Sequence, residues 1–209
     1  MSSVDYGKDG YCRPASDALL REVEWMVVDT DKAIARCPQR RVAVQAGGAY
    51  GLWPLHLAKS FAHVYTLEPD ALNFRCLVEN IGSSSNITPI RAALGAEAAS
   101  AALKRAKPEN AGSGYVIPGD DFAVVPLDQL ALKECDFLCL DVEGYELAAL
   151  QGATQTIERC RPVVMIEIKQ LPQMMEYGVT RQSAVDWLVE HGYREVERIH
   201  RDSIFVGTT

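Results

Sequence analysis

The sequence has little of what marks a membrane or secreted protein. No apolar stretch reaches the roughly 18 residues that a membrane-spanning helix needs. The first ten residues do not run from a basic segment into an apolar one, as a signal peptide would. We therefore expect a soluble, cytoplasmic protein with no membrane partner.

Metal-binding and disulfide patterns are also missing. The six cysteines include no pair separated by two residues, so neither a zinc site nor a disulfide framework is indicated, and we expect reduced, mostly buried thiols. The four histidines lack ligand spacing and are expected in surface or structural roles. They are His56, His63, His191 and His200.

Clusters of basic residues are absent as well. The chain has 21 Lys and Arg against 28 Asp and Glu, a net charge of -7, and its basic residues are dispersed, which disfavours a nucleic-acid partner. With 48% hydrophobic residues in a chain of 209, one sizeable core can be buried. We expect a single domain over residues 1–209.

What the sequence does contain, from residue 42 onward, is an alternation of short apolar runs and amphipathic segments. This pattern is typical of a doubly wound α/β fold, a mostly parallel sheet with helices on both faces. We predict strands at 42–46, 64–67, 87–92, 137–141 and 163–168, and helices at 52–60, 71–80, 143–160 and 181–191.

Three segments depart from the alternation. Residues 15–36 predict an amphipathic helix within an N-terminal extension, 1–40, that is a candidate lid over the substrate. Residues 96–124 predict an insertion over the binding face, and 98–104 within it fits either a helix or an extended edge. The runs 195–199 and 204–206 flank a turn too short for a parallel crossover, which predicts the antiparallel C-terminal hairpin of a Rossmann-like class I methyltransferase sheet rather than a dehydrogenase sheet.

A glycine-rich turn follows the first strand of the alternation. Gly47, Gly48 and Gly51 allow the backbone to turn sharply and to approach a ligand. Glu68 ends the next apolar run, 21 residues after Gly47, where an acid can accept both ribose hydroxyls of an adenosine. The alternative is a tight turn without a ligand, with Glu68 as a helix cap and Pro69 in the first helical turn. The two features together favour an adenosine site.

The turn lacks the G-x-G-x-x-G spacing of pyrophosphate-binding proteins, so a cofactor without phosphates is favoured. S-adenosylmethionine joins an adenosine to a carboxylate and a cationic sulfonium. Amides at the start of the helix after Gly51 are candidates to hold that carboxylate, and nearby acids favour the cation. Tyr50, Trp53 and Tyr115 are candidates to stack on adenine or to shape the substrate pocket.

Acidic residues follow two of the later strands. Asp141 and Glu143 come where the fourth core strand meets its helix, and Glu167 ends the fifth strand. Open α/β sheets bind ligands at this edge, so the three carboxylates are candidate catalytic residues, as a general base with orienting acids. An oxygen-ligand metal site is a further possibility that we disfavour against solvated strand ends. Glu146 is expected in a helix-dipole or surface role.

At these motifs the chain resembles the FkbM-type methyltransferases, class I enzymes that use S-adenosylmethionine. Its most specific part is Asp-Val-Glu-Gly at 141–144, followed by Leu-x-Gly at 150–152. The likeness keeps the family's order from 42 to 168. It is carried by residues 44–51, 64–70 with Asn73 and Asn80, 92–95, 125–128, 141–153 and 162–167.

The resemblance implies a position for each part of a bound S-adenosylmethionine. It assigns the methionine end to Gly47, Gly48 and Gly51, the ribose to Glu68, the adenine to Ala92 and Ala93, and the transferable methyl to Asp141. Gln45, Tyr50 and Pro69 complete the predicted cofactor site.

Two positions depart from the family's pattern. Gln45 stands where the family usually has an acid, and Ala49 where it commonly has an asparagine. Gln45 retains hydrogen bonding to an amino group but loses charge attraction, which predicts weaker cofactor binding or a site completed by substrate.

The sequence therefore predicts an S-adenosylmethionine-dependent O-methyltransferase with a small-molecule, sugar or other hydroxyl acceptor. One alternative is a nicotinamide-dependent oxidoreductase, which would bind a dinucleotide and normally have a further substrate region. Another is a non-catalytic, methyltransferase-like binding module, motivated by the two departures.

Overall fold

The computed structural model describes residues 4–7, 9–15 and 23–208, with the backbone alone for 23–26. Residues 16–22, part of the predicted N-terminal helix and lid, lie outside the described residues. The described part of that helix is α1 (Val23–Ile34).

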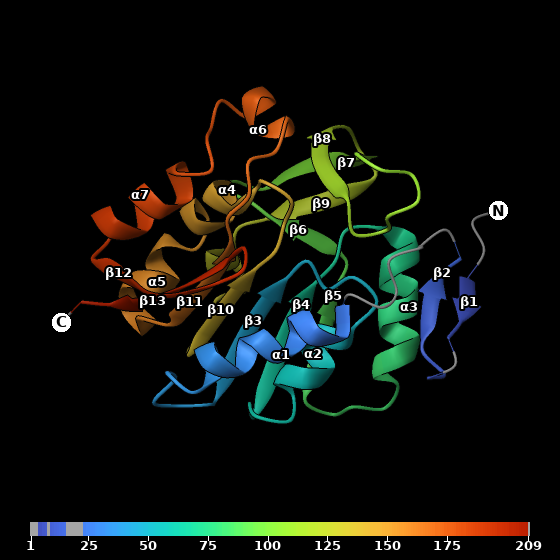
Figure 1. The fold of residues 1–209 in the computed structure, drawn as a ribbon, viewed down its shortest axis with the longest axis horizontal. Helices are drawn as coiled ribbons and strands as arrows, with labels where there is room; N and C mark the ends of the chain where they lie inside the picture. Colours follow the sequence, from blue (N-terminus) through green and yellow to red (C-terminus); the bar gives the residue numbers. More distant parts are fainter. Residues whose placement is uncertain (1–3, 8, 16–22, 209) are drawn as a thin grey trace.

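A seven-stranded sheet forms the centre of the described chain, in the order β12-β13-β11-β10-β3-β4-β5 (Figure 1). Neighbouring strands from β11 to β5 pair in parallel, whereas β13 pairs antiparallel with both β11 and β12. The predicted Rossmann-like methyltransferase sheet and its C-terminal hairpin are thereby confirmed. The strands are β3 (Val42–Ala46), β4 (His63–Leu67), β5 (Ile87–Ile90), β10 (Phe137–Leu140), β11 (Val163–Glu167), β12 (Tyr193–Ile199) and β13 (Asp202–Gly207).

Helices cover both faces of this sheet because successive strand residues point to opposite sides. In β10, Leu138 packs in an apolar cluster with α4, α5 and α7, whereas Phe137 packs with α1, α2 and α3. Both side chains are fully buried. The further helices are α2 (Leu52–Leu57), α3 (Ala71–Ile81), α4 (Glu146–Gln151), α5 (Thr154–Cys160), α6 (Gln173–Glu176) and α7 (Ser183–Glu190).

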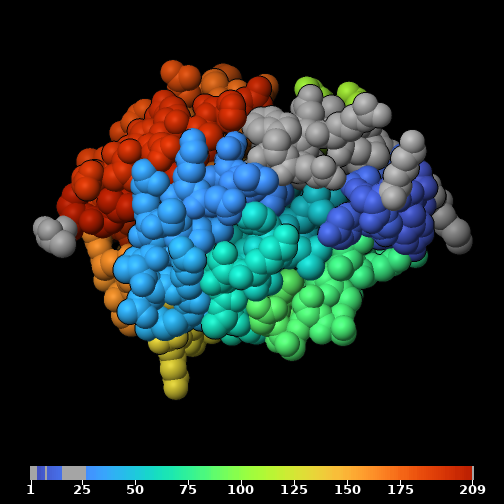
Figure 2. Space-filling view, turned by 60° about the horizontal axis from the view of Figure 1, so that its bottom comes forward, coloured from blue at the N-terminus to red at the C-terminus, as the bar shows by residue number. Residues whose placement is uncertain are grey.

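Polar contacts join α1 to the C-terminal hairpin. Glu197 on β12 accepts ion pairs from Lys32 at 3.2 Å and Arg36 at 2.6 Å. Figure 2 shows α1 and the C-terminal strands side by side on one face. None of the helices in the described ranges is both long and apolar enough to cross a membrane.

Most of the predicted insertion, 96–124, lies in a second, four-stranded sheet whose first strand precedes it. The expected strand 87–92 ends at Ile90, and the chain leaves the main sheet at Arg91 to begin β6 (Ala92–Leu94). Residues 98–104, which fitted either a helix or an extended edge, lie almost entirely in a strand, β7 (Ala99–Arg105). The sheet has the order β6-β9-β7-β8, with β8 (Gly114–Pro118) and β9 (Phe122–Val125).

The prediction of a single helix over 143–160 is wrong, because the structure has two helices there, α4 and α5. At the break, a Cβ atom on Gly152 would lie 1.9 Å from the carbonyl oxygen of Gly95. This close backbone approach leaves room only for glycine at the break. The helix predicted at 52–60 is also shorter and ends at Leu57.

A short N-terminal hairpin was not predicted. Strands β1 (Val4–Tyr6) and β2 (Cys12–Pro14) pair antiparallel and lie against α3. Asn80 on α3 bonds both ways with Cys12, accepting from its amide at 2.7 Å and donating to its carbonyl at 2.8 Å. The 3₁₀ helix η1 (Leu127–Leu130) precedes β10.

Candidate active site

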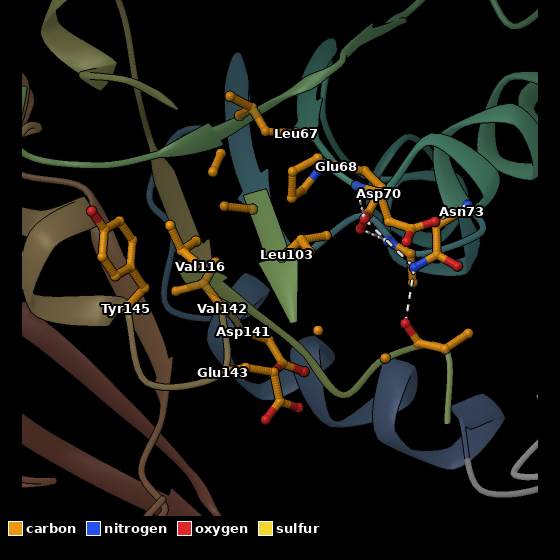
Figure 3. A pocket seen from close by; sticks show the side chains of 18 of the residues that line it. Leu67, Glu68, Asp70, Asn73, Leu103, Val116, Asp141, Val142, Glu143 and Tyr145 are labelled. Carbon is orange, nitrogen blue, oxygen red and sulfur yellow. Dashed lines mark hydrogen bonds between the residues drawn. The ribbon is translucent and has the colours of Figure 1, made fainter. Parts of the chain in front are cut away.

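A cavity of about 410 Å³ opens at the carboxyl ends of the central strands (Figure 3). Its volume is within the roughly 300–1,000 Å³ range of ligand pockets. The sheet order reverses between β3 and β10, and ligands of open α/β sheets bind at such a reversal. Glu68, Asp70 and Asn73 lie on one side of the cavity, and Asp141 and Glu143 on another.

Glu68, at the end of β4, is held by main-chain amides. Its Oε2 accepts from the amide of Ala49 at 2.8 Å, and its Oε1 accepts from the amide of Asp70 at 2.9 Å. Burial raises the pKa of Glu68 to about 7, although these amides oppose the shift. Asn73 Nδ2 also donates to Oε1, at 3.5 Å. A carboxylate has about four acceptor positions, so one position remains for a ribose hydroxyl, and a second hydroxyl would replace this long bond from Asn73.

The glycine turn is packed against the strands on either side of β3. The amides of Gly47 and Gly48 both donate to the carbonyl of Leu67, at 3.0 and 2.9 Å. A Cβ atom on Gly47 would lie 1.9 Å from the carbonyl oxygen of Asp141, so only glycine permits this approach. The turn places Ala49 in the left-handed region, with φ 44°.

Most of the predicted site residues meet in this cavity. They are Gly47, Tyr50, Glu68, Pro69, Ala92, Ala93, Asp141, Glu143 and Glu167, and Trp53 lies with them. Tyr115, a stacking candidate, is buried outside the lining, with the Lys104 ammonium over its ring.

Gln45, Gly48 and Gly51 were also expected to bind the cofactor, but the structure places them outside the cavity lining. Gln45 is fully buried; its Nε2 donates to the carbonyl of Gly47 at 2.8 Å and its Oε1 accepts from Thr66 Oγ1 at 2.6 Å. Gly48 and Gly51 face Leu77 of α3. All three residues thus stabilise the turn on the side that faces away from the cavity.

The three candidate catalytic carboxylates converge. Asp141, Glu143 and Glu167 each place an oxygen within 4.8 Å of the others. Lys169 lies among them, with its Nζ 2.9 Å from Glu143 Oε1 and in an ion pair with Glu167. This ammonium supplies the positive charge that a bound cation would otherwise provide.

The charges in this cluster shift one another's protonation. Burial, followed by the charge of Asp141, raises the pKa of Glu167 far above its usual value. Burial also raises the pKa of Glu143, and Lys169 opposes that shift. Burial acts to lower the pKa of Lys169, but the surrounding carboxylates outweigh it and raise the pKa. Lys169 therefore stays charged, whereas burial opposes the ionisation of Glu167 and Lys169 favours it.

The loop after β10 is shaped by a buried acid. Glu143 and Gly144 have positive φ, 54° and 95°, and Glu146 Oε1 accepts from the amides of Gly144 and Val142 at 3.1 and 3.3 Å. Glu146 is only 3% exposed, so its expected surface role is wrong. Its position in the first turn of α4 agrees with the helix-dipole role.

The insertion closes one wall of the cavity. Leu103 and Val116 line it, and Asn73 Nδ2 donates to the carbonyl of Ala111 at 3.1 Å. Arg105 forms a 3.0 Å ion pair with Asp70, which also caps α3 by accepting from two amides. The sequence suggested an insertion over the site but gave no signal for these particular contacts.

The cavity has features that fit S-adenosylmethionine. Glu68 offers acceptors for a ribose, and the small apolar residues Ala92 and Ala93 leave room for a flat ring. Asp141 and Glu143 place carboxylates two strands away from Glu68, where they would attract a cationic sulfonium. Both ends of the predicted cofactor site thus face one cavity.

Comparison with known proteins agrees with this geometry. A profile of the methyltransferase FkbM domain matches residues 46–195. No curated protein sequence matches the chain. Among solved structures, FkbM methyltransferase from Methylobacillus flagellatus is 20% identical with a TM-score of 0.50; the match covers 80% of this chain but only 43% of that protein.

Two further solved structures match over nearly their whole length. N-methyltransferase NodS from Bradyrhizobium japonicum is 10% identical with a TM-score of 0.56, covering 90% of this chain and 97% of that one. An rRNA methylase from Streptococcus thermophilus is 9% identical with a TM-score of 0.51, covering 87% and 95%. Such identities show a shared fold, whereas the domain profile covers most of the chain. The chain therefore belongs to the FkbM methyltransferase domain family of S-adenosylmethionine-dependent methyltransferases.

Proposed function

We propose that this enzyme transfers a methyl group to a hydroxyl oxygen of a small-molecule or sugar-like acceptor. The observation that carries the proposal is that Glu68 and the Asp141 cluster open into the same cavity. Bound S-adenosylmethionine would supply an electrophilic methyl on its sulfonium. The nicotinamide-dependent alternative is not supported, since the family match concerns methyltransferases.

Glu68 orients the cofactor in this proposal. Its two oxygens would accept the ribose hydroxyls, while Asn73 and the insertion enclose that end. The tips of β4 and β10 are two strands apart, about 10 Å at the usual strand spacing. Asp141, at the tip of β10, would then face the sulfonium and favour its charge.

Glu143 is the best placed general base. It lines the cavity and stays paired with Lys169, which favours the ionised form needed to take a proton. Its raised pKa makes it a stronger base near neutral pH. Glu167 is almost completely buried and contacts Lys169, and burial raises its pKa, so it would orient Asp141 and Lys169 rather than act as the base. The acceptor's hydroxyl proton would pass to Glu143 as the new oxygen–methyl bond forms and the sulfur–methyl bond breaks, which would leave S-adenosylhomocysteine as the second product.

A small acceptor in the cytoplasm is also part of the proposal. A chain with net charge -7 would repel a polyanion, which supports a small acceptor over nucleic acid. The six cysteines are free, even Cys12 and Cys76 with sulfurs 2.8 Å apart. Free thiols support a reducing compartment.

Calorimetry with S-adenosylmethionine tests whether the donor binds, and absence of binding by folded protein would contradict the proposal. Turnover of methyl-labelled donor against a metabolite extract tests whether the methyl group is transferred. Glu143→Gln should bind the donor but lose turnover. Donor binding without turnover by the unmodified protein would instead support a non-catalytic binding module.

A further inference from the structure

We infer that the acceptor carries an oxyanion, a carboxylate or a phosphate, which is bound by the guanidinium of Arg201. This inference rests on the proposed methyl transfer and names the class of substrate for the same cavity. It is drawn from the position of Arg201, from the pairing of most other charges in the lining, and from the separation between Arg201 and Asp141.

The backbone of Arg201 is fixed at the edge of the site. Arg201 lies in the tight turn between β12 and β13, next to His200 with its positive φ of 53°. Its carbonyl accepts from the amide of Ile168 at 2.7 Å, and the following residue, Asp202, pairs with Glu167 across the sheet. The side chain lines the cavity and is exposed at its mouth.

Several other charged groups of the lining already have partners. Asp70 pairs with Arg105, and Lys169 pairs with Glu143 and Glu167. Within the described residues, by contrast, the Arg201 side chain makes no hydrogen bond or ion pair, although its charge helps to keep Glu143 ionised. A planar guanidinium without a partner is suited to bidentate binding of a carboxylate or phosphate.

Lys107 is a second lining cation whose ammonium has no such partner in the described part of the chain. It belongs to the insertion loop that includes Ala111, whose carbonyl is bonded by Asn73 beside Glu68. Lys107 therefore lies toward the cofactor's ribose, whereas Arg201 lies on the other side of the reacting carboxylates.

The sheet order sets the separation between Asp141 and Arg201 that an acceptor would have to span. From β10 the next strands are β11 and β13, and two strand spacings amount to about 10 Å. The carboxylates and Lys169 occupy the middle of this stretch. A single ring with a hydroxyl at one end and an acidic group at the other would span it.

The local charge balance also permits an anion. Asp141, Glu143, Glu167 and Asp202 surround Lys169 and Arg201, but burial favours protonation of two of these acids: it raises the pKa of Asp202 to about 7 and that of Glu167 higher still. A bound sulfonium adds a positive charge, which an anionic acceptor would offset.

The test uses the full chain, methyl-labelled donor and a metabolite extract split on an anion-exchange column into acidic and neutral fractions. We expect the label in the acidic fraction. Arg201→Gln should raise KM for the labelled acceptor by about 10- to 100-fold, the size expected for charge-assisted hydrogen bonds. The change in kcat should be smaller, because Arg201 has a smaller effect on the pKa of Glu143 than Lys169 has. Arg194→Gln, at an exposed arginine of β12 outside the lining, is the matched control and should leave KM unchanged.

A second arm needs no turnover. Inorganic phosphate and acetate are titrated into protein saturated with S-adenosylhomocysteine, which also shows which oxyanion is preferred. Binding that is lost in Arg201→Gln and kept in Arg194→Gln supports the inference. Label in neutral acceptors alone, an unchanged KM in Arg201→Gln, or no Arg201-dependent anion binding overturns it. If S-adenosylhomocysteine itself does not bind, the proposed function fails first.

Discussion

The main-chain amide of Ala49 donates a 2.8 Å hydrogen bond to Oε2 of Glu68. This bond ties the turn after β3 to the end of β4, and the amides of Gly47 and Gly48 reinforce it by donating to Leu67. Glu68, proposed to hold the ribose, and the glycine turn, proposed to lie beside the methionine end, are therefore held together by hydrogen bonds. Changes at either residue should affect both the cofactor and the fold.

Replacing Glu68 with glutamine should weaken S-adenosylmethionine binding. The amide keeps one acceptor but turns an NH₂ group toward a main-chain N–H and loses the charge-assisted bonds to the ribose. We expect the Kd to rise about 10- to 100-fold, as for loss of hydrogen bonds to a charged group. Calorimetry measures this, with exposed Glu190→Gln as the control. An unchanged Kd in Glu68→Gln would show that the ribose binds elsewhere.

Cofactor affinity should also depend on pH. Burial raises the pKa of Glu68 to about 7 in the free protein, and only the ionised form accepts two hydroxyl donors. The affinity should therefore increase as the pH rises from about 6 to about 8, and binding should release a proton. Calorimetry in buffers of different ionisation enthalpy detects that proton. Glu68→Gln should remove the dependence, and an affinity that falls with pH would contradict this role.

The central sheet could be predicted because its strands are short apolar runs that end in chemically distinctive residues. Glu68, Asp141 and Glu167 follow such runs, and parallel strands bring their carboxyl ends to one edge. The sequence also predicted the turn after β3, because its glycines mark a place where the backbone must bend.

Tertiary contacts hid the rest. The helical pattern at 143–160 continues across Gly152, and only the approach of Gly95 reveals the break. Gln45 looked like a cofactor ligand, yet the structure turns its amide toward Gly47 and Thr66. Arg201 is separated from the glycine turn by 150 residues of sequence or more and joins the cavity only because the final hairpin packs beside β11.

Replacing Lys169 with methionine should shift the pH dependence of catalysis. Its ammonium, 2.9 Å from Glu143, opposes the burial that raises the pKa of that carboxylate. Without the ammonium, the acidic limb of the kcat profile should move up by about one pH unit or more, while donor affinity changes little. Rate measurements across pH test this, with exposed Lys59→Met as the control. An unmoved limb would remove Glu143 as the base.

Glu146→Gln should make stability less sensitive to pH. Burial raises the pKa of Glu146 to about 7, so the folded state retains a proton that the unfolded chain loses near pH 4.5. The unfolding free energy therefore falls as the pH rises between these values. Glutamine keeps the Oε1 acceptor for Gly144 and Val142 but cannot ionise. Between about pH 5 and pH 8 the free energy of unfolding should fall by about 1–3 kcal/mol less in the variant than in the parent protein.

Thermal unfolding followed across that pH range measures the difference. Glu68 and Asp202 contribute a slope of the same sign in both proteins, because burial raises their pKa values to about 7 as well. Exposed Glu158→Gln is the matched control and should reproduce the parent's slope. Parallel curves for parent and Glu146→Gln would mean that Glu146 is already ionised near pH 5.

Ala49→Asn should stabilise the protein. Ala49 has a left-handed φ of 44°, a conformation that asparagine adopts more readily than alanine. An asparagine at this position would thus have a backbone reason, independent of the cofactor. We expect a gain of about 0.5–1 kcal/mol in unfolding free energy, measured by denaturant titration. Ala131, with φ 48° and an exposed side chain, should gain similarly in Ala131→Asn, whereas extended, exposed Ala99→Asn should not. A loss at position 49 with a gain at 131 would show instead that the larger side chain clashes within the cavity.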